Sequence, residues 1–302
     1  MRERLCEYLI EQADDPTLVF ITGDLGFRLL EPLRDALGAR FINAGVAEQN
    51  MIGVAAGLSA KGLNTWVYSI APFVYARPFE QIRNDIAFHG LPVKLVGNGG
   101  GYGYGVHGPS HHALEDYGVL LTLPTFSAYI PVFDEDIFTV ARLATETTTP
   151  VYLRLGRDER PANYAPPEYE PWRHLIEGGG PVLAVVGPLA TTYLSDIAKI
   201  SHTRRPNLWA VSALPLEKSP PPMTFLDQVE SAGAVIAIEE HVQRGGFGAD
   251  LLRHFTESGV AVKTFRHLYA RSHDYGRYGS QNHLRRLSGL DPASVIGLTR
   301  DC

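Results

Sequence analysis

Residues 44–58 read AGVAEQNMIGVAAGL, and the assignment of a fold depends on them more than on any other part of the chain. Small residues recur through this run, so it predicts a helix from Ala47 to about Ala60 that packs closely against a neighbouring backbone. Glu48 stands one residue into that helix. A carboxylate in a first helical turn complements the helix dipole, so Glu48 has a purely structural interpretation beside any chemical one.

Short apolar runs alternate with helical segments on both sides of this helix, which is the pattern of an α/β fold. The runs are TLVFIT at residues 17–22, NTWVYSI at 64–70, LPVKLVG at 91–97 and PVYLRLG at 150–156. Between them the pattern predicts further helices, one of them from about Phe73 to Phe88. Apolar residues fill the strands without strict alternation, which indicates a sheet covered by helices on both faces.

The segment after the last of these strands is rich in proline and glycine and reads RDERPANYAPPEYEPWRHLIEGGG. That composition opposes both helix and sheet, so residues 158–180 are predicted to form an interdomain linker. A second, smaller α/β series follows, with the strand-like runs PVLAVVG, NLWAVSA, AVIAIEE and VAVKTF. The expected fold is therefore α/β with two doubly wound domains, residues 1–157 and residues 181–302.

The composition excludes several functional classes. The chain has 302 residues, 45% of them hydrophobic and 20% charged, and a formal net charge of −6. It contains no run of Lys and Arg and no long apolar segment, so nucleic acid and membrane are poor candidates for partners. Cys6 and Cys302 lie near the two ends, which fits neither a disulfide framework nor a metal site. Without a targeting segment, a cytoplasmic protein is expected.

The residues around Glu48 give it a chemical interpretation. The string AGVAEQN resembles the signature G-[IV]-A-E-Q-[HN] of transketolases, deoxyxylulose-phosphate synthases and the β chains of 2-oxo acid dehydrogenases. The strings ITGDLGF, YSIAPFVYARPFEQIRND, GPSHHALEDYGVLLTLP and the GGFG after AIEEH are similar to further transketolase segments, in the same order. The chain is therefore identified as a member of the transketolase family, and it resembles the C-terminal half: a pyrimidine-binding domain followed by a smaller C-terminal domain.

The resemblance implies thiamine diphosphate as the cofactor. The family's glutamate meets N1′ of the aminopyrimidine ring, and Glu48 stands at its position. Contact of N1′ with an acid lets the cofactor's own 4′-imino group remove the proton from C2 of the thiazolium ring. Expected cofactor contacts are Asp24, Val46, Glu48, Phe73 and Phe79. The two phenylalanines would stack on the ring, although each also suits the core side of an amphipathic helix.

By the same resemblance, the residues expected to bind the sugar are His107, His111 and Arg157. His111 in GPSHH matches a family histidine near the reacting carbonyl. Glu48 and His111 are therefore the two expected catalytic residues. His107 stands where sugar transketolases carry an acidic residue that reads a donor hydroxyl, so the donor stays open. Arg157 matches an arginine that binds the sugar phosphate, and Arg2 is a weaker second candidate.

The motif for the charged half of the cofactor is missing. In the family, a G-D-G followed downstream by Asn holds Mg²⁺ and the diphosphate, in a separate N-terminal domain. Here the Gly-Asp pair at residues 23–24 is followed by Leu25, and GNGGGYGYG lacks the acidic ligands of a Mg²⁺ site. The resemblance thus implies an enzyme active only with a G-D-G-containing N-terminal transketolase subunit that holds Mg²⁺, in an α2β2 assembly.

The expected activity is transfer of a two-carbon ketol unit from a ketose or ketose phosphate to an aldehyde. A β subunit of a 2-oxo acid decarboxylating enzyme has the same layout and stays an alternative, because His107 departs from the sugar pattern. A non-catalytic scaffold subunit is a second alternative, against which the retention of Glu48, Phe73, His111 and Arg157 argues. A Rossmann nicotinamide enzyme is disfavoured, because GNGGGYGYG does not lead into a helix with G-x-G-x-x-G spacing.

Overall fold

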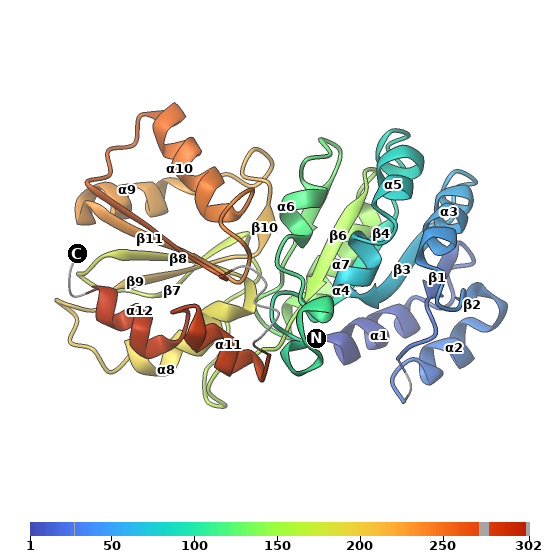
Figure 1. Ribbon diagram of the computed structural model, residues 1–302, viewed down its shortest axis with the longest axis horizontal. Helices are drawn as coiled ribbons and strands as arrows, with labels where there is room; N and C mark the ends of the chain where they lie inside the picture. The colour runs from blue at the N-terminus through green and yellow to red at the C-terminus, as the bar shows by residue number, and fades with distance from the viewer. Residues whose placement is uncertain (27, 272–277, 300–302) are drawn as a thin grey trace.

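The computed structural model describes residues 1–26, 28–271 and 278–299 and contains two β-sheets flanked by helices (Figure 1). The first sheet has the strand order β10-β5-β6-β4-β3-β1-β2. Its strands are β1 (Leu18–Thr22), β2 (Phe41–Asn43), β3 (Asn64–Ile70), β4 (Lys94–Asn98), β5 (Ser127–Tyr129), β6 (Val151–Leu155) and β10 (Ala213–Leu214). All of these pairings are parallel except the one between β5 and β10, which the later part of the chain adds at the edge.

Helices cover both faces of this sheet because its strands carry apolar residues on both sides. In β1, Leu18 and Phe20 belong to one buried cluster, and Val19 and Ile21 belong to the other, as the alternation of a strand requires. The helices on the Leu18 side are α1 (Arg2–Glu11), α2 (Glu31–Leu37) and α7 (Asp136–Glu146). Those on the Val19 side are α3 (Glu48–Ser59), α4 (Ala71–Tyr75) and α6 (Asp116–Leu120).

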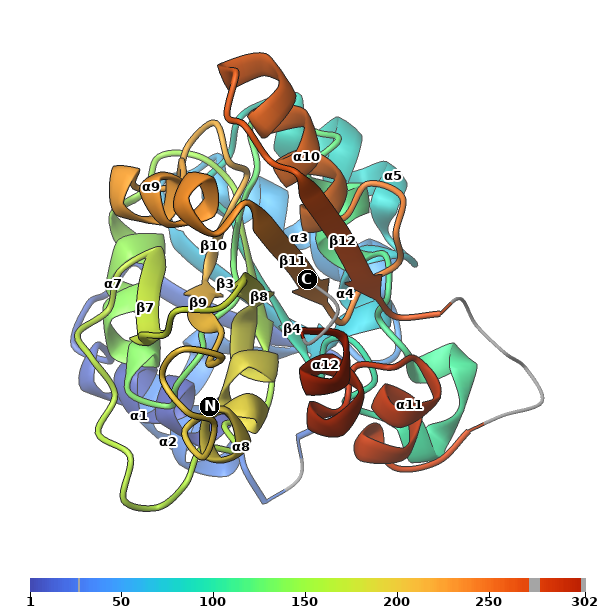
Figure 2. The same cartoon turned by 90° about the vertical axis from the view of Figure 1, so that its left-hand side faces the viewer.

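The second sheet lies beside the first and has the strand order β12-β11-β8-β9-β7 (Figures 1 and 2). Its strands are β7 (Trp172–Ile176), β8 (Val182–Val186), β9 (Asn207–Val211), β11 (Ala234–Glu239) and β12 (Thr264–Tyr269). One face packs on α9 (Met223–Ala232) and α10 (Phe247–Ser258), the other on α8 (Leu194–Ile197) and α12 (Pro292–Thr299). The expected class, two doubly wound α/β units, is confirmed. Of the helices described, none has the length and apolar character needed to cross a bilayer.

The expectation that residues 158–180 oppose sheet structure is wrong in part. Trp172–Ile176 form β7, which pairs antiparallel with β9 at the edge of the second sheet. The run WRHLI is itself compatible with a strand, and the surrounding prolines obscured it. An edge strand makes ladder hydrogen bonds on one side only, so prolines on either side of it are tolerated. The limits of the two domains stay a prediction.

The single helix expected from about Phe73 to Phe88 is also wrong. The chain forms α4, a turn at residues 76–78, the short helix α5 (Phe79–Gln81) and a π-helical turn over Ile82–Ala87. Pro78 lacks a backbone N–H and disfavours helical geometry at the residue before it, which explains a break at this place. Arg77 therefore stands in a turn rather than in a continuous helix.

Buried charged groups join the two halves of the molecule. Arg154 in β6 forms an ion pair with Asp116 at 2.9 Å, and its guanidinium also donates to the backbone carbonyl of Glu240. Glu240 follows β11 directly and pairs with Arg285 of α11 (Gln281–Leu287) at 2.7 Å. It also accepts a hydrogen bond from the backbone N–H of Tyr102. Because an unpaired buried charge is costly, these pairs hold the second sheet in one position against the first.

Candidate active site

Glu48 is the first residue of α3, and its side chain is only 6% exposed. The chain enters the helix from β2 through Gly45, whose φ of 72° lies in the left-handed region that favours glycine. Asn43, the last residue of β2, accepts a hydrogen bond from the backbone N–H of Gly45 at 3.0 Å and so fixes this turn. The local structure thus holds a buried carboxylate at the carboxyl edge of a parallel sheet, where ligands bind in open α/β folds.

The carboxylate of Glu48 has a close partner that the sequence did not reveal. The guanidinium of Arg77 donates a hydrogen bond to Oε1 of Glu48 at 2.7 Å. The same guanidinium lies over the ring of Phe73, 3.8 Å from its centroid, which is a close cation–π contact. Arg77 belongs to the run YARPF, so the resemblance pointed to the segment, but no sequence pattern shows a pairing between residues 29 positions apart.

Aromatic and imidazole rings extend the array away from Glu48. The ring of His111 lies edge-on to Phe73, with 5.1 Å between the centroids, and 5.2 Å from the ring of His107. Tyr104 contacts both histidine rings, and its hydroxyl accepts a hydrogen bond from Nδ2 of Asn98 at 2.6 Å. The predicted residues that the structure brings together are Glu48, Phe73, His107 and His111. Arg77, Tyr104 and Asn98 are additions to that set.

The surroundings of His111 favour its neutral form. Partial burial lowers the pKa of His111, and the nearby His107 and Arg77 lower it further. Its Nδ1 lies 3.0 Å from the hydroxyl of Ser110, so one ring nitrogen is engaged within the chain. A neutral imidazole carries one N–H donor and one acceptor, and it can therefore pass a proton at neutral pH.

The glycine-rich loop after β4 carries both histidines and serves packing. At Gly99, where φ is 74°, a side chain would collide with the ring of Tyr104. At Gly100 it would collide with the side chain of Arg154. These glycines are therefore required for close contact with an aromatic ring and a buried guanidinium, and the loop needs no phosphate to explain its composition.

The remaining predicted cofactor contacts lie around this array. Asp24 accepts a hydrogen bond from Nδ2 of Asn43 at 3.1 Å, so it is linked to the turn that leads to Glu48. The side chain of Val46 is 77% exposed and points out of the chain. Phe79 in α5 is half-buried against the main core. Asp24 and Val46 thus lie beside the turn that leads to Glu48, Phe79 packs on the core, and the contact of each with the cofactor stays a prediction.

Arg157 lies apart from the array, on a cleft of about 440 Å³. Arg2 lines the same cleft, so the two candidate phosphate arginines are brought to one place. Tyr104 lines it as well and connects it to the histidines. The wall also carries the carboxylates of Glu3, Asp134 and Asp158.

These residues fit one half of thiamine diphosphate. A buried carboxyl group and an aromatic face, Glu48 and Phe73, suit the ring nitrogen and the flat surface of an aminopyrimidine. Within residues 1–26, 28–271 and 278–299, no group of three or more His, Cys, Asp or Glu side chains is placed to hold a metal ion. Glu48 and Phe73 therefore fit the pyrimidine half of the cofactor.

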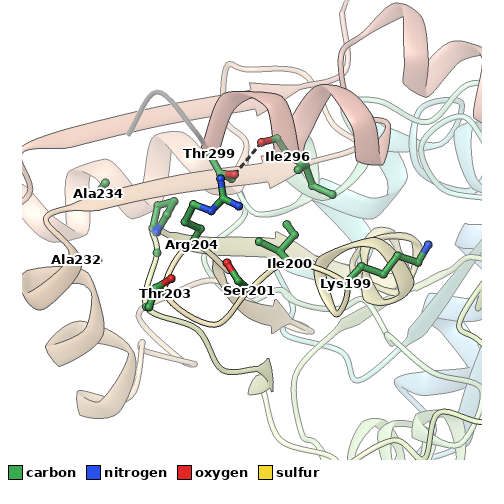
Figure 3. A pocket seen from close by; sticks show the side chains of 12 residues that line it. Lys199, Ile200, Ser201, Thr203, Arg204, Ala232, Ala234, Ile296 and Thr299 are labelled. Atoms are coloured by element: carbon green, nitrogen blue, oxygen red, sulfur yellow. Dashed lines mark hydrogen bonds between the residues drawn. The ribbon is translucent and has the colours of Figure 1, made fainter.

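A separate cavity of about 650 Å³ lies at the amino ends of β8 and β11 (Figure 3). Arg204 reaches across it toward Thr299, near the end of α12 (Figure 3). The described lining includes hydroxyl groups and cations but no carboxylate or imidazole. Because the described lining lacks these groups, the Glu48 array is the better candidate for an active site.

Comparison with known proteins agrees with this geometry. Residues 9–162, just over half of the chain, match the family described as transketolase, pyrimidine binding domain. The chain belongs to the transketolase family. Among curated transketolases, an apulose-4-phosphate transketolase subunit of Phocaeicola vulgatus is 29% identical over 272 residues, which span 87% of this chain and 85% of that one.

Solved transketolase structures show which part of the family the chain represents. A structure described as a split gene transketolase, inactive beta4 tetramer, superposes with a TM-score of 0.81 at 27% identity and covers 99% of this chain and 96% of its own. The transketolase of Leishmania mexicana shares the fold, with a TM-score of 0.77 at 18% identity, but the match spans only 45% of that protein. The predicted resemblance to the C-terminal, or beta, part of a transketolase is confirmed.

Proposed function

We propose that the chain is the C-terminal subunit of a two-component, thiamine-diphosphate-dependent transketolase, which transfers a two-carbon ketol unit from a ketose or ketose phosphate to an aldehyde. The observation that carries the proposal is the buried carboxylate of Glu48 at a helix start, joined through the guanidinium of Arg77 to the ring of Phe73, which contacts His111. An acid, a flat ring and a neutral imidazole are what an aminopyrimidine and a sugar carbonyl require. Similarity to the Phocaeicola vulgatus transketolase subunit over 85% of its length supports the same function.

Each residue has a distinct role in this function. Thiamine diphosphate, when bound, would supply a carbon nucleophile for a ketose carbonyl. Glu48 would hold N1′ of the cofactor by a hydrogen bond, and Phe73 would flank the aminopyrimidine ring. His111, whose pKa is lowered by burial, by His107 and by Arg77, donates to the substrate oxygen or accepts its proton. Asp24, Val46 and Phe79 are proposed as further cofactor contacts, Val46 because its exposed side chain can reach a molecule bound from outside the chain.

The substrate extends from the array toward the cleft. We assign the donor phosphate to Arg157, with Arg2 beside it, because both guanidinium groups line this cleft and a planar fork suits a phosphate. The three carboxylates in the same wall offset the charge of the two guanidinium groups, so the phosphate contact is expected to be modest. His107, beside His111, is proposed to contact a donor hydroxyl.

The site needs a second chain. Nothing in the donor set described above holds Mg²⁺ or a diphosphate, so we propose that an N-terminal transketolase subunit containing G-D-G supplies these ligands, in an α2β2 enzyme. The structure described as an inactive beta4 tetramer supports this proposal, because beta subunits of that relative assemble without activity.

Reconstitution with such a subunit tests the function. The mixed chains should consume a ketose or ketose phosphate in a reaction that requires thiamine diphosphate, Mg²⁺, an aldehyde acceptor and both chains. Turnover of pyruvate but of no ketose would favour the 2-oxo acid alternative, and a partner equally active without this chain would favour a scaffold. Light scattering measures the stoichiometry, and an active complex of one chain with one partner would contradict α2β2.

A further inference from the structure

Arg77 engages the two groups that the proposed function assigns to the aminopyrimidine ring. Its guanidinium donates to the carboxylate of Glu48 at 2.7 Å and stacks on Phe73 at 3.8 Å from the ring centroid. A guanidinium is a planar, delocalised cation with N–H donors at its edge. An aminopyrimidine protonated on N1′ has the same features: a flat face, a positive charge and an N–H directed at an acid.

We propose that Arg77 occupies the aminopyrimidine position in the free chain, and that the cofactor binds by displacing it. This inference rests on the proposed function of Glu48 and Phe73. Although a carboxylate can accept more than one hydrogen bond, a second flat group cannot stack on the face of Phe73 that the guanidinium covers. A buried carboxylate without a partner is costly. The pairing of Arg77 with the buried Glu48 therefore also stabilises the free chain before the cofactor binds.

The position of Arg77 allows it to leave. The residue stands in the turn between α4 and α5, and its side chain is 44% exposed, although that of Glu48 is 6% exposed. Its guanidinium can therefore turn into water by rotation about side-chain bonds, without a change in the helices that position Glu48 and Phe73. When the guanidinium leaves Glu48 and Phe73, water hydrates it again. This hydration offsets part of the lost contact energy, so the contact can form in the free chain and still be displaced by a ligand.

Displacement has a measurable consequence for affinity. A ligand that binds only the fraction of chains whose pocket is open shows an apparent affinity reduced by that fraction. If the contacts of Arg77 to Glu48 and Phe73 keep the pocket closed about nine-tenths of the time, their removal strengthens binding about tenfold. Arg77 is thus a positioning residue, one that acts on cofactor access through Glu48.

Calorimetry on the full chain tests the inference, with 4-amino-5-hydroxymethyl-2-methylpyrimidine as the probe. Arg77→Ala should bind the probe about tenfold more tightly than wild type. Arg77→Lys keeps the charge but not the planar face, so its affinity for the probe should lie between those of wild type and Arg77→Ala. Arg83→Ala is the matched control, because Arg83 is exposed in the same segment and its guanidinium donates to the adjacent Asn84, and it should bind as wild type does.

The free-chain comparison decides the inference. Probe binding by Arg77→Ala that is absent, equal to wild type or weaker overturns displacement. A second measurement, thiamine diphosphate with Mg²⁺ on the chain assembled with its partner, separates this failure from that of the proposed function. If the wild-type assembly binds thiamine diphosphate, the proposed function holds even where displacement by the cofactor is wrong. If the wild-type assembly does not bind it, both the proposed function and the displacement are wrong.

Discussion

Replacement of Glu48 by Gln separates a chemical role for this residue from a structural one. Gln keeps the size and the hydrogen-bonding capacity of Glu, but it cannot share a proton with N1′ as an acid does. In the enzyme assembled with its partner we expect kcat to fall by about 10²–10⁴, the usual effect of removing a positioned acid or base. A loss of that size corresponds to about 3–5 kcal/mol in the activation barrier.

The structural contribution of Glu48 is smaller, and the geometry bounds it. Its ion pair with Arg77 is half-open to water, because the arginine side chain is 44% exposed, so the pair contributes at most about 1 kcal/mol. Its charge at the start of α3 adds about 0.3–1 kcal/mol through the helix dipole. Glu48→Gln should therefore lower the free energy of unfolding by no more than about 2 kcal/mol and leave the partner contact intact.

Hydrogen–deuterium exchange at C2 of the cofactor, measured in the assembled complex, distinguishes the two roles. We expect slow exchange in Glu48→Gln and a wild-type rate in Glu80→Gln, a control that makes the same change at an exposed carboxylate in α5. Urea unfolding of both variants measures the structural part separately. A wild-type exchange rate in Glu48→Gln would refute the reasoning, because an acid that can be neutralised without effect does not act on N1′.

Three further predictions address the substrate, the histidines and the pH dependence of stability. Arg157→Gln should raise KM for a phosphorylated donor about tenfold and leave an unphosphorylated donor unaffected, and equal changes for both donors would exclude a phosphate contact. His107→Asn should raise the pKa of His111 in an NMR titration, because His107 is one of the groups that lower it, and an unchanged value would contradict the coupling. Burial lowers the pKa of Lys94 to about 8 in the folded chain, against 10.5 when unfolded, so its ammonium destabilises the fold below pH 8 and this cost disappears as pH rises to 10.5. Lys94→Met should therefore be more stable than wild type by about 2–3 kcal/mol at pH 7, with a difference in urea unfolding that shrinks above pH 8, and a difference that does not change with pH would contradict the sign.

The class of fold and the place of Glu48 were predictable because both depend on local sequence. Uninterrupted apolar runs separated by helical segments specify a sheet covered on both faces, and the two sheets confirm it. The turn into α3 uses Gly45 and Asn43, residue types that tolerate or cap such a turn. The break at Pro78 was also readable, but the apolar period on either side of it favoured one continuous helix.

The pairings between distant charged residues were not predictable. Arg154 and Asp116 are both buried, yet charged side chains are mostly exposed, so nothing in the sequence marks these two as interior. The same holds for the contact of Arg77 with Glu48, whose existence depends on how two segments meet after folding. The spacing of apolar residues in a sequence indicates whether a segment is a helix or a strand. It does not show which side chains of different segments pair, because that depends on tertiary packing.

The buried pairs also give the second sheet a part in the site. The loop that carries His107 and His111 is held by the second half of the chain, because Glu240 accepts the backbone N–H of Tyr102 at 2.6 Å. Arg154 fastens the same loop, since one amino group of its guanidinium donates at 2.9 Å to the carbonyls of both Ala113 and Glu240. Arg154 thus bridges the loop to the end of β11. Residues of both halves of the chain thus support the loop that positions the two imidazole groups.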